Sequence, residues 1–253
     1  MENDLVPLDI DDRFRFACTP RVPCFNACCR DLHQYLTPYD ILRLKNRLGL
    51  RSGVFLKRYT EAGIGPQTGL PVIRLRMNSG RGFACPFVTD DGCSVYEDRP
   101  ASCRIYPVAR AIRRCRRTGA VTEHFALLRE PHCRGFEQEK TQSVREWIQR
   151  QDMEVYNRFN DLLLDIIQLK NQRLPGPLDL RFRSAFHLGL YDPDAFRDHL
   201  DRNGFPESLN TSPSDSEAIL SDELERLRFG HRWVRWSLFE ARSRSADEPL
   251  SKP

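Results

Sequence analysis

The nine cysteines of this chain constrain its fold and chemistry more than any other sequence feature. Eight of them form two groups and a closing member, and the ninth stands between the last two, in this order: Cys18, Cys24, Cys28 and Cys29; Cys85, Cys93 and Cys103; Cys115; Cys133. Thiols do not persist as disulfides in a reducing cytosol, so a dense set is better explained by metal coordination or redox chemistry. No cysteine follows residue 133, which places any sulfur chemistry in the N-terminal part of the chain.

The overall composition is that of an ordinary globular protein. Hydrophobic residues make up 40% and charged residues 29% of the 253 positions. No apolar run is long enough to span a bilayer, and the N-terminus, Met1 to Asp4, is acidic and lacks an apolar signal core. We therefore expect a cytoplasmic protein without membrane contact.

The balance of charge does not favour nucleic acid as a partner. The formal net charge is only +4, which is too mild to indicate nucleic-acid binding by itself. One denser basic patch could present its charge to an anionic partner, and it consists of Arg110, Arg113, Arg114, Arg116 and Arg117. The preferred interpretation of this patch is a solvated strand face.

The eight grouped cysteines stand in loop-forming sequence. Proline, asparagine, aspartate and glycine surround them, as a chelating backbone requires. Neighbouring side chains diverge along an extended backbone, so Cys28 and Cys29 are expected not to share one ion: one of them faces a second site or is spare. Cys115 differs from the eight because it stands in a strand-like segment, and we interpret it as a bystander.

Patterns in the N-terminal part predict short helices and hairpins. Thr37 as a cap, Pro38 at the first position and Gly49 as a left-handed stop predict a helix, and Ser52 is expected to cap a second one. Alternating residues 72–77 predict a hairpin that delivers Cys85, and a second hairpin, with its turn at Thr118-Gly119, is expected over 108–128.

Residues 142–173 have apolar positions at helical spacing and predict one long amphipathic helix, ended by the prolines at 175 and 177. Residues 208–216 are expected to form a flexible loop and residues 221–242 a final helix. Its aromatic residues, Trp233, Trp236 and Phe239, could bind a base or a partner helix, but their spacing favours core packing.

Together these patterns predict an α+β fold, with a small cysteine-rich module of short helices and hairpins followed by a helical C-terminal region. We expect a cysteine-cluster metal-binding domain over residues 1–140 and a helical region over 141–253. A protein partner could bind through the C-terminal helices.

The cysteine segments as an ordered series resemble a known family. They are Phe16-Ala17-Cys18, Cys24-Phe25-Asn26-Ala27-Cys28-Cys29-Arg30, Cys85-Pro86-Phe87, Cys93-Ser94-Val95-Tyr96-Glu97-Asp98-Arg99-Pro100, Cys103-Arg104-Ile105-Tyr106-Pro107 and Cys133-Arg134-Gly135. Over residues 14–136 this series is similar to the YkgJ-type cysteine-cluster family of zinc- or iron-chelating domains. The gap between Cys18 and Cys24 is longer than is usual in that family, which puts the role of Cys18 in question.

The resemblance implies metal or iron–sulfur binding by the eight matched cysteines: Cys18, Cys24, Cys28, Cys29, Cys85, Cys93, Cys103 and Cys133. Arg99 and Arg104 belong to the matched motif and could offset the charge of the thiolates and hydrogen-bond their sulfurs. Eight cysteines with little histidine favour an iron–sulfur cluster slightly over zinc. Two four-thiolate sites, or a single cluster with additional thiols, would both satisfy the count.

Two other classes of function stay open. The cysteine segment of flagellin lysine methylase looks similar, so a cluster-dependent enzyme of electron transfer or protein-lysine N-methylation is an alternative. A structural zinc adaptor is another. The sequence offers no base or nucleophile for a catalytic role.

Overall fold

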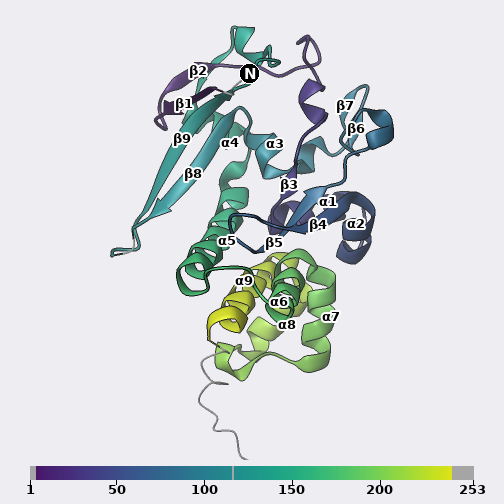
Figure 1. Ribbon diagram of the computed structural model, residues 1–253, viewed down its shortest axis with the longest axis vertical. Coiled ribbons are helices and arrows are strands. Elements are labelled where there is room, and N and C mark those ends of the chain that lie inside the picture. Colours follow the sequence, from purple (N-terminus) through teal and green to yellow (C-terminus); the bar gives the residue numbers. More distant parts are fainter. Residues whose placement is uncertain (1–3, 116, 241–253) are drawn as a thin grey trace, which may run out of the picture. The chain divides into compact units, whose positions relative to one another are not determined.

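Small antiparallel sheets with short helices, and a separate set of longer helices, make up the computed structural model, which describes residues 4–115 and 117–240 (Figure 1). The predicted α+β class with a helical C-terminal region is confirmed. Two compact units are present, one of Met1–Gln34 with Leu75–Arg158 and the other of Tyr35–Arg74 with Phe159–Pro253. The expected division at residue 140 stays a prediction, and the compact units differ from it in grouping residues 35–74 with the C-terminal residues.

The first unit carries all nine cysteines. Its strands and α-helices are β1 (Asp4–Leu8), β2 (Arg13–Arg15), β6 (Val88–Thr89), β7 (Gly92–Cys93), α3 (Ala101–Ile105), β8 (Val108–Arg114), β9 (Val121–Arg129), β10 (Thr141–Ser143) and α4 (Val144–Arg150). Its 3-10 turns are η1 (Ala27–Cys29), η2 (Ser79–Arg81), η3 (Tyr96–Asp98) and η4 (Gly135–Glu137). The strands form sheets in the orders β1-β9-β8, β10-β2 and β6-β7. The antiparallel pairing of β8 with β9, from Val108↔Leu127 to Arg114↔Val121, confirms the second predicted hairpin.

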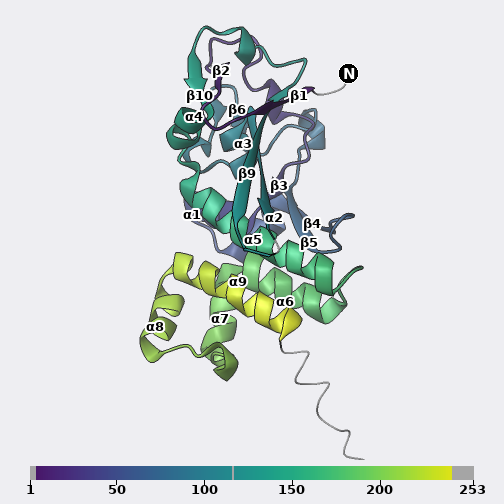
Figure 2. The ribbon, with the colours of Figure 1, turned by 90° about the vertical axis from the view of Figure 1, so that its left-hand side faces the viewer.

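The second unit is mainly helical (Figure 2). Its elements are β3 (Tyr35–Leu36), α1 (Pro38–Arg47), α2 (Ser52–Tyr59), β4 (Thr60–Ile64), β5 (Pro71–Leu75), α6 (Leu180–Tyr191), α7 (Pro193–Asn203), η5 (Glu207–Leu209), α8 (Pro213–Ser221) and α9 (Glu223–Phe239). Helix α5 (Met153–Arg173) contains the boundary between the units, after Arg158. Among the described residues, no helix combines the length and the apolar character that a bilayer crossing requires.

The two helices predicted before residue 60 are both present. Thr37 and Asp40 form a reciprocal capping box at the start of α1, Pro38 occupies the first turn, and Gly49 is left-handed with φ 62°. Ser52 is not a cap, because Arg51 is the N-cap of α2. The Ser52 backbone N–H donates instead to the Asp194 carboxylate, at 2.6 Å.

Strand β5 corrects the first predicted hairpin. It pairs with β3 and β4 in a sheet of order β3-β5-β4, and not with the segment that leads to Cys85. Only an isolated bridge between Asn78 and Ala84 closes the turn before that cysteine. The alternating pattern correctly predicted a strand. That strand pairs with β3 and β4, which come earlier in the sequence, and not with the segment that follows it.

The single helix predicted over residues 142–173 is wrong, because the chain forms α4 and then α5. Asp152 interrupts them in the left-handed conformation, with φ 49°, which aspartate tolerates better than most residues. The second half of the predicted loop 208–216 is also wrong, since Ser212 caps α8 and Pro213 begins it. The final helix is confirmed as α9, which starts after the Asp222 cap; residues 241 and 242 of the prediction lie outside the described part.

Helices α6 and α9 pack closely through two glycines. A Cβ atom on Gly230 would lie 2.1 Å from the Gly189 carbonyl oxygen, so neither helix has room for a side chain at this crossing. Trp233 and Phe239 are buried in the same core, with the Phe196 ring 5.1 Å from that of Trp233. Core packing is therefore confirmed for these two aromatic residues, while Trp236 is half-buried.

Candidate metal centre

Hydrogen bonds hold the first group of cysteines beside the second. Asn26 adopts the left-handed conformation, with φ 66°, and begins the η1 turn that carries Cys28 and Cys29. Its side-chain amide donates to the Thr89 carbonyl at 3.1 Å. The Cys85 backbone N–H donates to the Cys29 carbonyl at 2.8 Å. These two bonds join segments that are about 60 residues apart in the sequence.

The segment from Cys85 to Cys93 is a tight hairpin of β6 and β7. Val88 pairs with Cys93 across it, and Gly92 turns with φ 124° beneath the Phe25 ring, which would lie 3.2 Å from a Cβ atom there. Cys103 stands on α3, and its thiol donates a hydrogen bond to the Gln34 side-chain oxygen at 3.3 Å. Each of these sulfurs is therefore placed by a turn or a short helix.

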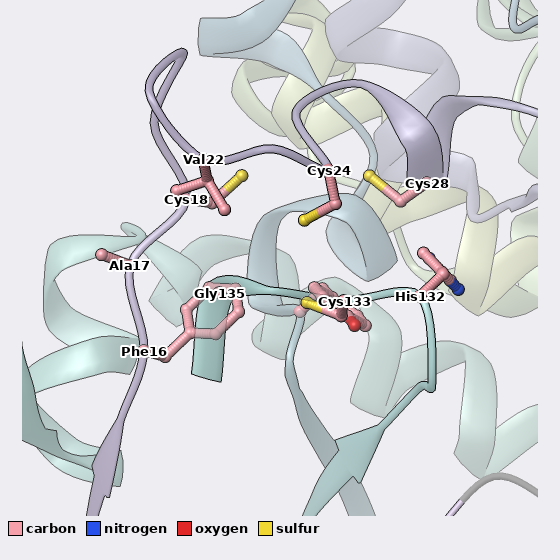
Figure 3. A pocket seen from close by; sticks show the side chains of 10 residues that line it. Phe16, Ala17, Cys18, Val22, Cys24, Cys28, His132, Cys133 and Gly135 are labelled. Carbon is pink, nitrogen blue, oxygen red and sulfur yellow. The ribbon is translucent and has the colours of Figure 1, made fainter. Parts of the chain in front are cut away.

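The first and last of the matched cysteines meet around a small cavity (Figure 3). Cys18, Cys24 and Cys28 line it from one loop, and Cys133 lines it from the segment that precedes η4. Its volume is about 30 Å³. The Arg134 backbone N–H donates to the Cys24 sulfur at 3.1 Å, so this backbone already presents a donor to a predicted ligand.

Gly135 allows two segments of the chain, that of Cys133 and that of Cys18, to approach at this cavity. The Ala17 N–H donates to the Gly135 carbonyl at 3.1 Å. A Cβ atom on Gly135 would lie 2.4 Å from the Phe16 ring and 3.0 Å from the Ala17 carbonyl oxygen. Only glycine fits here without displacing the Cys133 segment from the Cys18 segment.

All eight matched cysteines lie in one electrostatic neighbourhood. Each is close enough to at least one other for the charge of one sulfur to raise the pKa of another, in these combinations: Cys18 with Cys24, Cys28 and Cys133; Cys29 with Cys28, Cys85 and Cys103; Cys85 with Cys93 and Cys28; Cys93 with Cys28; Cys133 with Cys24. The fold thus brings the eight predicted ligands together, while their role as ligands stays a prediction.

Cys115 does not share the surroundings of the eight. It is fully exposed near the tip of the β8–β9 hairpin, where hydrogen bonds from Thr118 and from the backbone of Thr118 and Arg117 lower the pKa of its thiol. None of the interactions with other cysteines involves it among the described residues.

Burial keeps several of the clustered thiols protonated at neutral pH. It raises the pKa of Cys18 and of Cys85 to about 11, and it also raises the pKa of Cys93 and Cys133. A metal would have to displace these protons, so binding is expected to release protons and to strengthen as pH rises.

The adjacent pair Cys28 and Cys29 behaves differently from the sequence-based expectation. The two thiols share a hydrogen bond, which lowers the pKa of Cys28 to about 7 and, together with burial, raises that of Cys29. The expectation that the side chains diverge is wrong because residues 27–29 form a 3-10 turn and not an extended strand. Cys28 is thus the easier of the two sulfurs to deprotonate.

Although the sulfurs are neighbours, they do not form a closed coordination shell. Within residues 4–115 and 117–240, no group of three or more cysteine, histidine, aspartate or glutamate side chains stands close enough together to hold a metal ion as it is. The donor set nevertheless fits zinc or an iron–sulfur cluster, because both take thiolate ligands. Rotation of side chains within the loops would be needed to close a site.

The two arginines predicted to offset the thiolate charge, Arg99 and Arg104, are both buried and held by carbonyl oxygens. Arg99 donates to Tyr96 O and to the Gln151 side chain, at 2.5 Å each, and its charge lowers the pKa of Cys18 and Cys93. Arg104 donates to the backbone oxygens of Gln151 and Glu97. Arg99 therefore acts on the thiols through its charge, while the hydrogen bonds of Arg104 fix the surrounding backbone.

Sequence reasoning missed two residues that shape this neighbourhood. Tyr106 lines the cavity, as does His132 beside Cys133, and Gln34 accepts the hydrogen bond from Cys103. Tyr106 stands inside the matched stretch from Cys103 to Pro107, and that position was the available signal. Gln34 gave none, since it lies outside every cysteine segment.

One of three comparisons with known proteins found a match. The family model CxxCxxCC, described as "Putative zinc- or iron-chelating domain", matches residues 17–147. Searches of curated proteins and of solved structures found no significant match. Because the family model covers more than half of the chain and all nine cysteines, the chain belongs to the CxxCxxCC family of zinc- or iron-chelating domains.

Proposed function

We propose that this protein is a cytoplasmic iron–sulfur protein whose eight matched cysteines supply the thiolates. The observation that carries the proposal is the single neighbourhood of eight sulfurs, assembled from segments as distant in the sequence as those of Cys18 and Cys133. In the described part of the chain, His132 is the one histidine that lines the cavity, and its ring stands 3.8 Å from the Glu130 carboxylate. Thiolates are soft ligands, and a sulfur-rich donor set of this kind favours metals that prefer sulfur, iron–sulfur clusters among them.

The residues of the chain would prepare the site in two ways. Burial holds most thiols protonated until a metal replaces the protons, whereas Cys28, with its pKa of about 7, offers a thiolate first. Arg99 offsets part of the negative charge that accumulates as the sulfurs ionise. An iron–sulfur cluster, once bound, would supply one-electron transfer.

Anaerobic purification with metal and sulfide analysis tests the proposal. The expected protein is brown, has broad visible absorption, and contains iron and acid-labile sulfide. Cys85→Ser should lose most of the iron, because Cys85 interacts with a sulfur of each group, Cys93 of its own group and Cys28 of the first. The matched control is Cys115→Ser, which removes a thiol outside the neighbourhood and should retain the full iron content.

Two outcomes would contradict the iron–sulfur assignment. A colourless protein with stoichiometric zinc that is lost in Cys85→Ser would replace it by a structural zinc module. An anaerobic preparation that contains neither metal, and takes up neither on reconstitution, would remove metal chelation as the function of this chain.

A further inference from the structure

The hydroxyl group of Tyr106 is buried beside the cysteine neighbourhood. The tyrosine lines the same cavity as Cys18, Cys24 and Cys133. Its ring packs edge-on against Phe16, with centroids 5.9 Å apart. Among the described residues the hydroxyl has no hydrogen-bond partner of ordinary geometry. A buried donor left without an acceptor is costly, so the position calls for an explanation.

The cavity and the groups that contact this hydroxyl identify its acceptor. Cys133 lines the same cavity as Tyr106. The Cys133 thiol and, more weakly, the Glu130 carboxyl are the side-chain groups that interact with the hydroxyl. Of these two groups, the Cys133 sulfur is the predicted metal ligand.

The two forms of that sulfur differ as acceptors. A protonated thiol accepts hydrogen bonds weakly, whereas a thiolate is an ionised acceptor and forms stronger bonds. We propose that Tyr106 is a positioning residue that donates its hydroxyl hydrogen bond to the Cys133 sulfur when that sulfur binds a metal. The inference rests on the proposed function, since it requires Cys133 to be a ligand.

This arrangement has opposite consequences for the two states of the protein. In the metal-free protein the hydroxyl contributes no good hydrogen bond, so removing it should leave stability unchanged or raise it. In the metal-bound protein the same change removes a hydrogen bond to a ligand, and the loss of such outer contacts weakens metal binding by roughly 10–100-fold. A residue with a merely structural role would instead lower the stability of the metal-free protein.

Binding of Co²⁺ to the metal-free full chain under anaerobic conditions tests the proposal. The thiolate-to-cobalt charge-transfer band reports the number and energy of bound sulfurs, and competition with a chelator gives the affinity. We expect Tyr106→Phe to bind Co²⁺ about 10-fold or more weakly, with unchanged band intensity and a shift to lower energy. Tyr156→Phe is the matched control, because it removes another buried hydroxyl of the same unit that does not line the cavity.

Each result decides between the proposals. A wild-type protein that binds no Co²⁺ would overturn the proposed function and this inference with it. A wild type that binds while Tyr106→Phe matches it within about twofold, with the band unmoved, would overturn the inference alone. A Tyr106→Phe protein that unfolds more readily than the wild type without metal would also overturn it, since that result assigns the hydroxyl a structural role.

Discussion

Buried His231 makes the stability of the second, mainly helical unit (the helical unit) depend on pH. The structure determines the direction of this dependence. The side chain is 4% exposed on α9. Its Nδ1–H donates to the Leu227 carbonyl at 2.8 Å, and Nε2 has no partner among the described residues. Protonation would place an N–H there without an acceptor, and burial accordingly lowers the pKa of His231 to about 4.

The sign and the magnitude follow from proton linkage. The usual pKa is 6.5, so below that pH the unfolded chain takes up a proton that the folded chain resists. Stability is therefore fully present above pH 6.5 and is lost as pH falls toward 4. A tenfold difference in proton affinity between the folded and the unfolded chain corresponds to about 1.4 kcal/mol. The full loss of unfolding free energy is therefore about 3 kcal/mol, of which about 2 kcal/mol falls between about pH 7 and pH 5.

Urea denaturation at these two pH values measures the effect. Tryptophan fluorescence in a Trp147→Phe background follows Trp233 and Trp236, which both lie on α9. His231→Phe should reduce the loss of unfolding free energy between the two pH values by about 2 kcal/mol. Leu238→Ala, at a fully buried position of the same helix, should lower stability at both values and keep the wild-type pH dependence. The reasoning is refuted if His231→Phe loses as much stability as the wild type between the two values.

Three further substitutions test other close contacts. Gly230→Ala should destabilise the helical unit by about 1–3 kcal/mol or more in denaturation, because its Cβ would lie 2.1 Å from the Gly189 carbonyl. Lys170→Met should cost about 2 kcal/mol, since the buried ammonium donates to carbonyl oxygens of two loops, including that of Gly176. Gly135→Ala should lower both the thermal stability of the cysteine unit and its metal content, because the new Cβ would lie 2.4 Å from the Phe16 ring.

Controls for these substitutions come from the same chain. Gly53→Ala places its Cβ at an ordinary 3.6 Å from Asp192 within α2 and should stabilise the helix by up to about 1 kcal/mol. Lys140→Met alters an exposed lysine and should change stability by less than about 0.5 kcal/mol. If Gly230→Ala and Lys170→Met behave like these controls, the close packing and the buried hydrogen bonds do not stabilise the protein as described.

The sequence by itself determined the class of the protein and the elements that depend on local rules. The eight cysteines with their flanking motifs indicated a metal-binding family. Caps and turns such as Thr37, Gly49 and Thr118-Gly119 predicted α1 and the β8–β9 hairpin correctly, because cap hydrogen bonds and left-handed turns act within a few residues. Helical periodicity predicted α9 for the same reason, although it could not detect the break at Asp152.

Only the tertiary structure decided how distant segments meet. It paired β5 with β3, and it placed the Cys85 N–H on the Cys29 carbonyl. It also brought the Tyr106 hydroxyl against Cys133 and set Gly189 against Gly230. These contacts join residues far apart in the chain, where spacing carries no information about distance. The sequence thus identified the candidate sulfur ligands, and the tertiary contacts of the backbone brought them close together.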